Sequence, residues 1–160
     1  MQDPEQAARA SLFRSFVIYS LMLLGDIAAV TWIATSGPTG AAYATLSVVA
    51  VVGLLLAYQA YAHYRDLREP LAESEGPVSR VWARADLIIA WHSYYVSVGR
   101  GVYRMRAEDY VVLEDRVRRL QAADPPREMY VKIDHFPRTL NVVSIHEMAP
   151  PSPAPPAILP

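Results

Sequence analysis

Cysteine is absent from the 160 residues, and lysine occurs once, at Lys132. The lack of cysteine excludes disulfides, thiolate metal sites, iron–sulfur clusters and a cysteine nucleophile. Charged residues make up only 19% of the chain, against roughly 25% in a typical soluble domain, and the formal net charge is −1. A net charge this small gives no overall positive field, so we expect no nucleic-acid partner.

Hydrophobic residues make up 52% of the chain and are concentrated in two segments. Residues 16–35 are apolar except for Asp26, and residues 41–62 contain no ionised side chain. A helix rises about 1.5 Å per residue, so roughly 20 residues cross a hydrocarbon core of about 30 Å. Residues 36–40 between the segments suffice for a tight turn. The sequence therefore predicts a membrane α-helical hairpin of two transmembrane helices.

The basic residues give the predicted hairpin a direction. No basic residue lies in the turn, whereas six arginines flank the other ends of the two segments: Arg9, Arg14, Arg65, Arg68, Arg80 and Arg84. The positive-inside rule then predicts that both termini lie in the cytoplasm and the turn lies outside. The expected location is a bacterial inner membrane, crossed by two spans. A cleaved signal peptide is disfavoured because the apolar stretch exceeds the roughly 7–15 residues of a signal core. Asp3 and Glu5 near the N-terminus also disfavour it.

Small residues recur at helical spacing in both predicted spans, at Gly25 and Ala29 in the first and at Gly53 and Ala57 in the second. Small side chains let helices approach closely in lipid, so these positions either pack the spans together or contact helices of another protein. Asp26 is costly at membrane depth and is expected to face protein. We interpret it as an interhelical hydrogen-bonding group, protonated or paired with another subunit, in preference to a proton relay.

The pattern changes after the second span. Residues 65–76 read as a charged connector, and residues 77–148 as a small β-rich cytoplasmic domain. Alternating apolar runs predict strands over 81–90, 94–98, 102–105, 129–134 and 140–145, with a helix over 108–121. The expected fold is a small α+β, barrel-like β domain with one helix. Its expected core is Val96, Val98, Leu113, Val117, Val131, Ile133 and Val142.

Two stretches of this domain resemble a family. YYVSVGRGVYRMRAEDYVVLE and MYVKIDHFPRTLNVVSIHE resemble the small β domains of bacterial two-span membrane proteins. In that family a "YY" strand, a helix with an aromatic residue and a "Y–PR–SI" hairpin follow two spans. The matching residues are Tyr94, Tyr95, Tyr110, Tyr130, Pro137, Arg138, Ser144 and Ile145. The resemblance implies a fold and a topology but no activity, and this chain departs from it where residues 124–127 lengthen the join to the last hairpin.

The C-terminal residues 149–160 form a low-complexity proline segment with polyproline II character. Alone, such a segment is expected to have no fixed structure. It would lose little entropy on docking to another chain, so we expect it to bind a partner. The expected docking residues are Pro150, Pro151, Pro153, Pro155 and Pro156.

Candidate chemical groups are few. His63, at the cytoplasmic end of the second span, could ligate a haem or chlorin. A pigment-binding histidine more usually lies inside an apolar stretch, whereas this one is next to Tyr64 and Arg65, which disfavours the role. His92, His135 and His146 show no metal-ligand spacing, and Ser93 and Ser144 lack a nucleophile motif. Arg116, Arg118 and Arg119 either contact lipid headgroups or form a solvated helix end. We expect no catalysis, cofactor, metal or small-molecule substrate.

Three functions remain open. The first is a non-catalytic accessory subunit of a larger bacterial membrane complex, with an energy-converting complex, photosynthetic or respiratory, as the favoured kind. The second is a membrane-anchored adaptor whose β domain binds a soluble partner. The third is a component of a proton or ion pathway that uses Asp26. The expected partners are other membrane-protein subunits and lipid.

Overall fold

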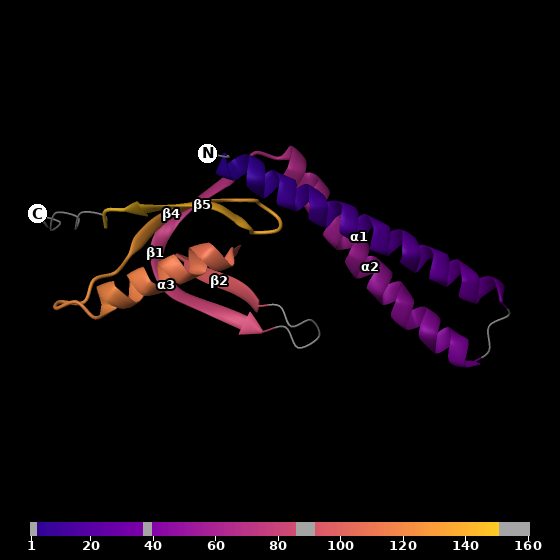
Figure 1. The fold of residues 1–160 in the computed structure, drawn as a ribbon. Helices are drawn as coiled ribbons and strands as arrows, with labels where there is room; N and C mark the ends of the chain where they lie inside the picture. The colour runs from indigo at the N-terminus through magenta and orange to yellow at the C-terminus, as the bar shows by residue number, and fades with distance from the viewer. Residues whose placement is uncertain (1–2, 37–39, 86–91, 151–160) are drawn as a thin grey trace, which may run out of the picture. The chain divides into compact units, whose positions relative to one another are not determined.

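The structure is a computed structural model that describes residues 3–36, 40–85 and 92–150. Two long helices, α1 (Pro4–Thr35) and α2 (Gly40–Arg68), come first in the chain (Figure 1). A five-stranded sheet with one helix follows. Its elements are β1 (Ala72–Ala85), β2 (His92–Val98), β3 (Gly101–Met105), α3 (Ala107–Gln121), β4 (Tyr130–His135) and β5 (Val142–Met148).

The chain forms two compact units. The hairpin unit contains residues 1–71 together with the turn Phe136–Thr139, and the sheet unit contains residues 72–135 and 140–160. The chain therefore passes between the units three times. The short turn between β4 and β5 belongs to the hairpin unit although it is distant from it in sequence.

Both helices of the hairpin unit are long and apolar enough to cross a membrane. They run side by side, and their less exposed positions recur at spacings of three and four, the pattern of two helices that pack along one seam (Figure 1). The seam consists of Leu12, Phe16, Tyr19, Leu23, Asp26, Val30 and Ile33 on α1, and Ala42, Leu46, Val49, Gly53, Leu56, Ala60 and His63 on α2. Each helix extends beyond the span predicted from hydropathy.

Within the sheet unit all ladders are antiparallel, in the order β3-β2-β1-β4-β5. The long strand β1 pairs with β4 over Ala72–Pro77 and with β2 over Val78–Ala85. Gly76 lies where this change of partner occurs: a Cβ there would lie 3.0 Å from the Gly99 Cα, so only glycine allows the two backbones to approach.

The predicted barrel is not formed. The ladders end at β3 and β5, which leaves the sheet open. Among the described residues, β3 is bridged to this side of the sheet only by an isolated parallel bridge between Arg104 and Asn141, the residue just before β5. A pattern of five short strands is compatible with both an open and a closed sheet. Closure depends on pairing between the edges, and that pairing stops after one bridge.

The predicted core is confirmed. Val96, Val98, Leu113, Val131, Ile133 and Val142 are buried, and Val117 packs against them while partly exposed. Helix α3 contributes Leu113 from its apolar face and packs on β1 and β2. The first strand differs from the prediction, because β1 begins at Ala72 inside the expected connector. The end of its predicted range, residues 86–90, lies outside the described residues.

Candidate functional site: a buried carboxylate at the end of α2

Asp66 is the most deeply buried charged group in the described part of the chain, with 0% of its surface exposed. It follows His63 by three residues and therefore continues the α2 seam beyond the apolar segment. Its two carboxylate oxygens accept hydrogen bonds from the backbone N–H groups of Arg138 (3.0 Å) and Thr139 (2.8 Å). A carboxylate is stable in such a place only when its oxygens are hydrogen-bonded, and these two bonds meet that requirement.

The side chain of Arg138 adds a second connection between the turn and α2. Its guanidinium lies 3.3 Å from the Glu69 carboxylate and 5.7 Å from the ring centroid of Tyr61. Arg65 also donates to Glu69, with its Nε 2.9 Å away. The hydrogen bond from Arg65 lowers the pKa of Glu69. Glu69 is therefore shared between its own helix and the turn.

Helix α1 contributes to the same cluster from its first turns. The Arg9 guanidinium lies 5.9 Å from the ring centroid of Phe136, donates to the backbone oxygen of Leu67 (3.1 Å) and pairs with Glu5 (2.8 Å). Phe136 is only 1% exposed. The beginning of α1, the end of α2 and the turn thus meet at one place, which we call the hairpin-end cluster: Arg9, Asp66, Glu69, Phe136, Arg138 and Thr139.

One atom of the cluster lacks a partner among the described residues. The hydroxyl of Thr139 is buried without a hydrogen bond, although its backbone N–H is bound by Asp66. The arrangement as a whole is a docking site for a peptide turn, in which backbone donors meet a fixed carboxylate. The cluster also contains two cations, Arg9 and Arg138, and a second carboxylate, Glu69.

Sequence reasoning did not single out Asp66. The residue lay within the expected charged connector, where a carboxylate is normally solvated. The available signal was the spacing from His63, which places the carboxylate on the buried stripe. Pro137 and Arg138, by contrast, were noted through the family resemblance, and they form the turn that the carboxylate binds.

The predicted intramembrane residues take different positions. Asp26 is half-buried on the seam opposite Gly53, where an added Cβ would collide with the Asp26 Oδ2 atom. Ala57 is half-buried on α2, whereas Gly25 and Ala29 are exposed on α1, and nothing lies within 4 Å of a Cβ built on Gly25. Of these small residues, Gly53 therefore allows close approach of the two helices, while Gly25 and Ala29 face outward.

The interhelical hydrogen bond expected of Asp26 does not form between the residues that the structure describes, where this carboxylate meets Gly53 by packing. His63 is 7% exposed, its Nδ1 lies 2.8 Å from the Gln59 carbonyl oxygen, and its ring centroid is 5.1 Å from that of Tyr19. The helix backbone and an aromatic neighbour thus surround the imidazole.

Polar clusters of the sheet unit complete the set of candidates. His135 Nε2 lies 3.0 Å from the Ser74 hydroxyl, which also accepts a hydrogen bond from Tyr103 (2.9 Å). On the β4–β5 ladder, the Ser144 hydroxyl donates a hydrogen bond to the Asp134 carboxylate and lies 3.2 Å from His146 Nε2. His92 is exposed at the start of β2. Among the described residues, no three histidine and carboxylate side chains are grouped to hold a metal ion.

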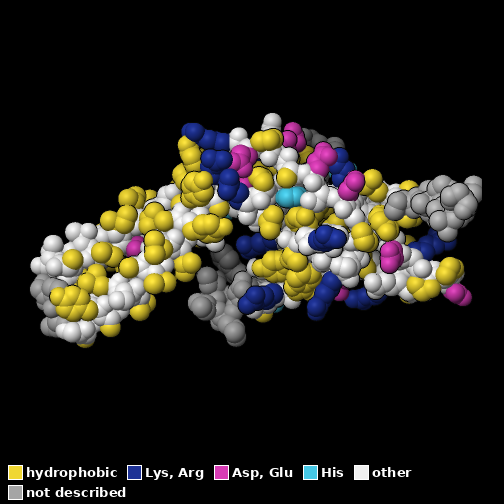
Figure 2. All heavy atoms as spheres, turned by 180° about the vertical axis from the view of Figure 1, so that it is seen from behind, with side chains coloured by type: hydrophobic (Ala, Val, Ile, Leu, Met, Phe, Trp, Pro, Cys, Tyr) yellow, Lys and Arg dark blue, Asp and Glu magenta, His cyan; other side chains and the backbone are white. Residues whose placement is uncertain are grey.

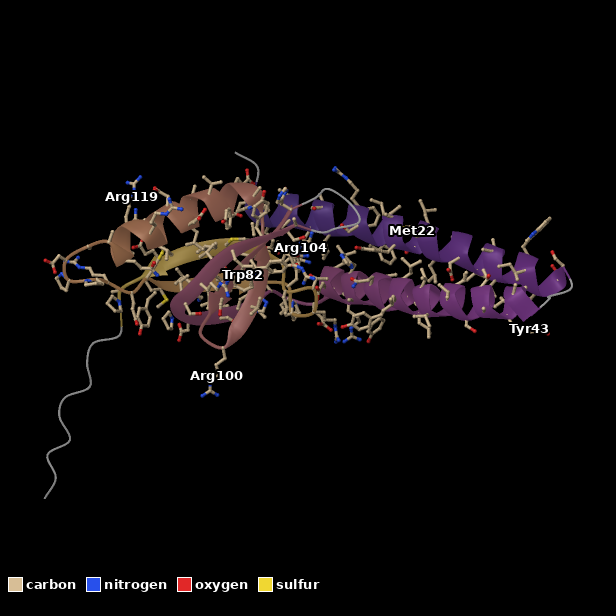
Figure 3. The ribbon with its side chains drawn as sticks, turned by 90° about the horizontal axis from the view of Figure 1, so that it is seen from below. Met22, Tyr43, Trp82, Arg100, Arg104 and Arg119 are labelled. Atoms are coloured by element: carbon tan, nitrogen blue, oxygen red, sulfur yellow. The ribbon has the colours of Figure 1, made fainter. Side chains whose placement is uncertain are left out.

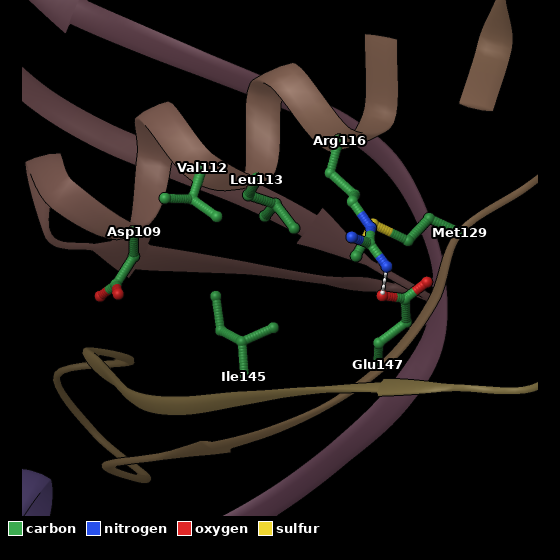
Figure 4. A pocket seen from close by; sticks show the side chains of 7 residues that line it. All are labelled: Asp109, Val112, Leu113, Arg116, Met129, Ile145 and Glu147. Carbon is green, nitrogen blue, oxygen red and sulfur yellow. Dashed lines mark hydrogen bonds and ion pairs between the residues drawn. The ribbon is translucent and has the colours of Figure 1, made fainter. Parts of the chain in front are cut away.

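The arginines of α3 are neutralised locally. Arg116 pairs with Glu147 (2.7 Å), Arg118 with Glu114 (3.0 Å) and Arg119 with Asp115 (2.5 Å). The ion pair of Arg116 crosses a pocket of about 290 Å³ between α3 and β5 (Figure 4). The pocket is lined by Asp109, Val112, Leu113, Arg116, Met129, Ile145 and Glu147.

Among the predicted docking prolines, Pro151, Pro153, Pro155 and Pro156 lie outside the described residues, and Pro150 is the last described residue.

Comparison with known proteins does not assign this chain to a family. No family model, curated protein or solved structure matches this chain.

Proposed function

We propose that this protein is a non-catalytic accessory subunit of a larger bacterial membrane complex, inserted in the cytoplasmic membrane by α1 and α2. The observation that carries the proposal is the outward face of the hairpin unit, much of which is hydrophobic in Figure 2. Large apolar side chains on both helices are exposed, among them Leu21 (63%), Trp32 (74%), Leu54 (72%) and Leu55 (61%). Soluble proteins rarely expose a continuous apolar surface of this extent, so lipid or the helices of other subunits must cover it.

The cationic ends of the helices support a cytoplasmic location for both termini. Arg9 and Arg14 lie on the first turns of α1, and Arg65 and Arg68 lie on the last turn of α2. Tyr43 lies near the start of α2 (Figure 3) and Trp32 near the end of α1, and both are aromatic residues of the kind enriched at membrane interfaces. Arginine at one end and aromatic residues at the other favour the predicted orientation.

The hairpin-end cluster supports a scaffolding role over a transient adaptor role. A flexible adaptor is expected to have its domain on a single free linker. Here a turn of the β4–β5 hairpin is bound to α2 by the Asp66 carboxylate. That binding site stabilises the position of the turn in the hairpin unit, as a subunit with a fixed place in an assembly requires. An energy-converting complex, photosynthetic or respiratory, stays the prediction for the kind of assembly.

Gly25 provides the test. Because Gly25 is exposed and nothing in the described chain lies within 4 Å of a Cβ built there, we expect Gly25→Leu to leave the hairpin intact while blocking close approach of a partner helix. The matched control is Ala34→Leu, which adds bulk at an exposed position nine residues, or about two and a half turns, farther along α1. We expect the first variant, and not the second, to lose partners that co-purify with the wild type in mild detergent.

A complex that retains both variants equally would contradict contact through this face. If no membrane protein co-purifies with the wild-type chain, while a soluble protein does so through the sheet unit, the adaptor role replaces this proposal.

A further inference from the structure

One face of the sheet unit carries arginines that are not neutralised. Arg80 and Arg84 lie on β1, Arg104 on β3 and Arg100 in the β2–β3 turn, and all four are exposed. None of them forms an ion pair within the described residues, whereas Arg106, Arg116, Arg118 and Arg119 of the same unit all do. The positive charge of the sheet unit is therefore unevenly distributed.

The strand register places these arginines together. Arg80 pairs across the β1–β2 ladder with Ser97, and Arg84 with Ser93, while Arg104 pairs with Tyr95 across the β2–β3 ladder. Alternation then puts Arg80, Arg84 and Arg104 on the side opposite the core residue Val96. Residues 78–85 and 92–105 contain no aspartate or glutamate, so the second half of β1, together with β2 and β3, places no carboxylate among these arginines. The two glutamates of β1, Glu73 and Glu75, lie in its first half, which pairs with β4.

Two aromatic rings lie among the arginines. Trp82 stacks on its cross-strand neighbour Tyr95, with ring centroids 5.6 Å apart and an angle of 20° between the planes. The Arg80 guanidinium lies 5.5 Å from the centroid of the Trp82 ring. Figure 3 shows Trp82 and Arg104 on these strands and Arg100 projecting from the turn. We call Arg80, Trp82, Arg84, Tyr95, Arg100 and Arg104 the cationic face.

We propose that the cationic face binds the phosphate groups of anionic lipid headgroups. Guanidinium groups recognise phosphate through paired hydrogen bonds, and tryptophan and tyrosine are the aromatic residues typical of the membrane interface. Trp82 contacts Tyr95 and Arg80, so it supports the arginines and is poorly placed to stack on a nucleic-acid base. This inference rests on the proposed membrane anchor, which keeps the sheet unit close to a bilayer.

The test uses the full chain in lipid nanodiscs with a nitroxide quencher on the headgroups. Trp82 becomes the only tryptophan after Trp32→Phe and Trp91→Phe, and its fluorescence then reports contact of the cationic face with the bilayer surface. We expect Trp82 to be quenched at least about threefold more in discs that contain phosphatidylglycerol than in phosphatidylcholine discs, and high salt should remove the difference.

Charge-matched variants decide whether the position of the arginines matters. In the first, Arg80, Arg84, Arg100 and Arg104 are all replaced by glutamine, and in the second the ion-paired Arg106, Arg116, Arg118 and Arg119 are replaced. Both variants lose four positive charges from the sheet unit. The first should lose the lipid-dependent quenching and the second should keep it. An equal loss in both would overturn the proposal, because it would show a response to net charge alone.

Three further measurements test the membrane anchor and the kind of anion that the cationic face binds. A variant that keeps only Trp32 reports insertion of the hairpin, because a quencher on the lipid chains then reaches this tryptophan. If Trp32 is not quenched, the proposed membrane anchor is wrong. If Trp32 is quenched but Trp82 shows no lipid-dependent quenching, only the proposed lipid site is wrong. Inorganic phosphate that shifts Trp82 emission in phosphatidylcholine discs as strongly as phosphatidylglycerol does would show a site for free phosphate. Tight binding of a single-stranded oligonucleotide, lost only in the first charge variant, would show a nucleic-acid site. Either of these last results would overturn the lipid assignment.

Discussion

At the scale of single residues, Asp66 shows how a charge becomes structural. A buried carboxylate loses the hydration it has in the unfolded chain, and only good hydrogen bonds compensate for that loss. The backbone donors of Arg138 and Thr139 supply these bonds, and neither depends on a side chain of the turn. The site therefore recognises the shape of the turn, whatever the side chains at these positions.

Replacing Asp66 tests this role of the carboxylate. In Asp66→Ala the two backbone N–H groups lose their acceptor, and each unsatisfied buried donor costs about 1–3 kcal/mol. We expect the Arg138 and Thr139 amides to exchange with deuterium much faster in this variant, while amides of β2 and β3 keep their protection. The control is Arg138→Ala, which removes the ion pair with Glu69 and leaves the backbone donors bound. Unchanged exchange in Asp66→Ala would refute the role of the carboxylate.

The ionisation of Glu69 gives the cluster a dependence on pH. Its pKa is lowered in the folded chain, first by the hydrogen bond from Arg65, with a further contribution from Arg138. A group with a lowered folded pKa stabilises the fold above its unfolded pKa and loses that effect as pH falls through the folded value. Protection of the turn should therefore be constant near neutral pH and decline below about pH 4.

Glu69→Gln serves as the comparison, measured by amide exchange at several pH values. This variant should lack the part of the acid response that comes from Glu69. An acid response as large as that of the wild type would assign the titration to other carboxylates.

At the scale of elements, the seam between α1 and α2 depends on one glycine. The Asp26 carboxylate occupies the space that a side chain at position 53 would need. Gly53→Ala should therefore displace this carboxylate and destabilise the hairpin by about 1–3 kcal/mol. The cost should be smaller in an Asp26→Ala background, and a double-mutant cycle of thermal unfolding in detergent measures the difference. Additive effects would show that the two residues do not interact.

The same scale shows what a sequence can and cannot reveal. Hydropathy was enough to find both long helices, and alternation found the β2–β3 and β4–β5 hairpins, because these signals are local. The first half of β1 was missed because Ala72–Pro77 contains two glutamates, a glycine and a proline, which indicate a loop. Its partner β4 is more than fifty residues away, and that pairing, together with the contact of Gly76 with Gly99, makes the segment a strand.

The candidate site escaped the sequence for a similar reason. Asp66 and Arg138 are 72 residues apart, and nothing local marks either as the partner of the other. The cationic face follows from register: Arg80 and Arg104 come together only when both strands pair with β2. Residue types indicate which interactions a chain offers, whereas long-range pairing decides which ones form.

At the scale of the whole molecule, two units of different construction should differ in stability. The helices satisfy their backbone hydrogen bonds internally and are expected to persist in detergent, whereas the sheet unit depends on a small core around Val96 and Ile133. Heating in detergent should therefore remove the β signal in circular dichroism first and leave helical signal. Val96→Ala should lower only the first transition, by roughly 4–8 °C per kcal/mol lost. A single transition shifted as a whole would show that the units unfold together.

The membership of Phe136–Thr139 in the hairpin unit has a consequence for modularity. A cut after Leu71 would deprive the Asp66 carboxylate of its two backbone donors and would leave Phe136, now 1% exposed, without its surroundings. Neither piece would then be a self-contained unit, because one would contain the Asp66 carboxylate and the other the backbone donors of Arg138 and Thr139. An exchange of the hairpin unit for that of another protein, by evolution or by engineering, would have to transfer the helix end and the distant turn together.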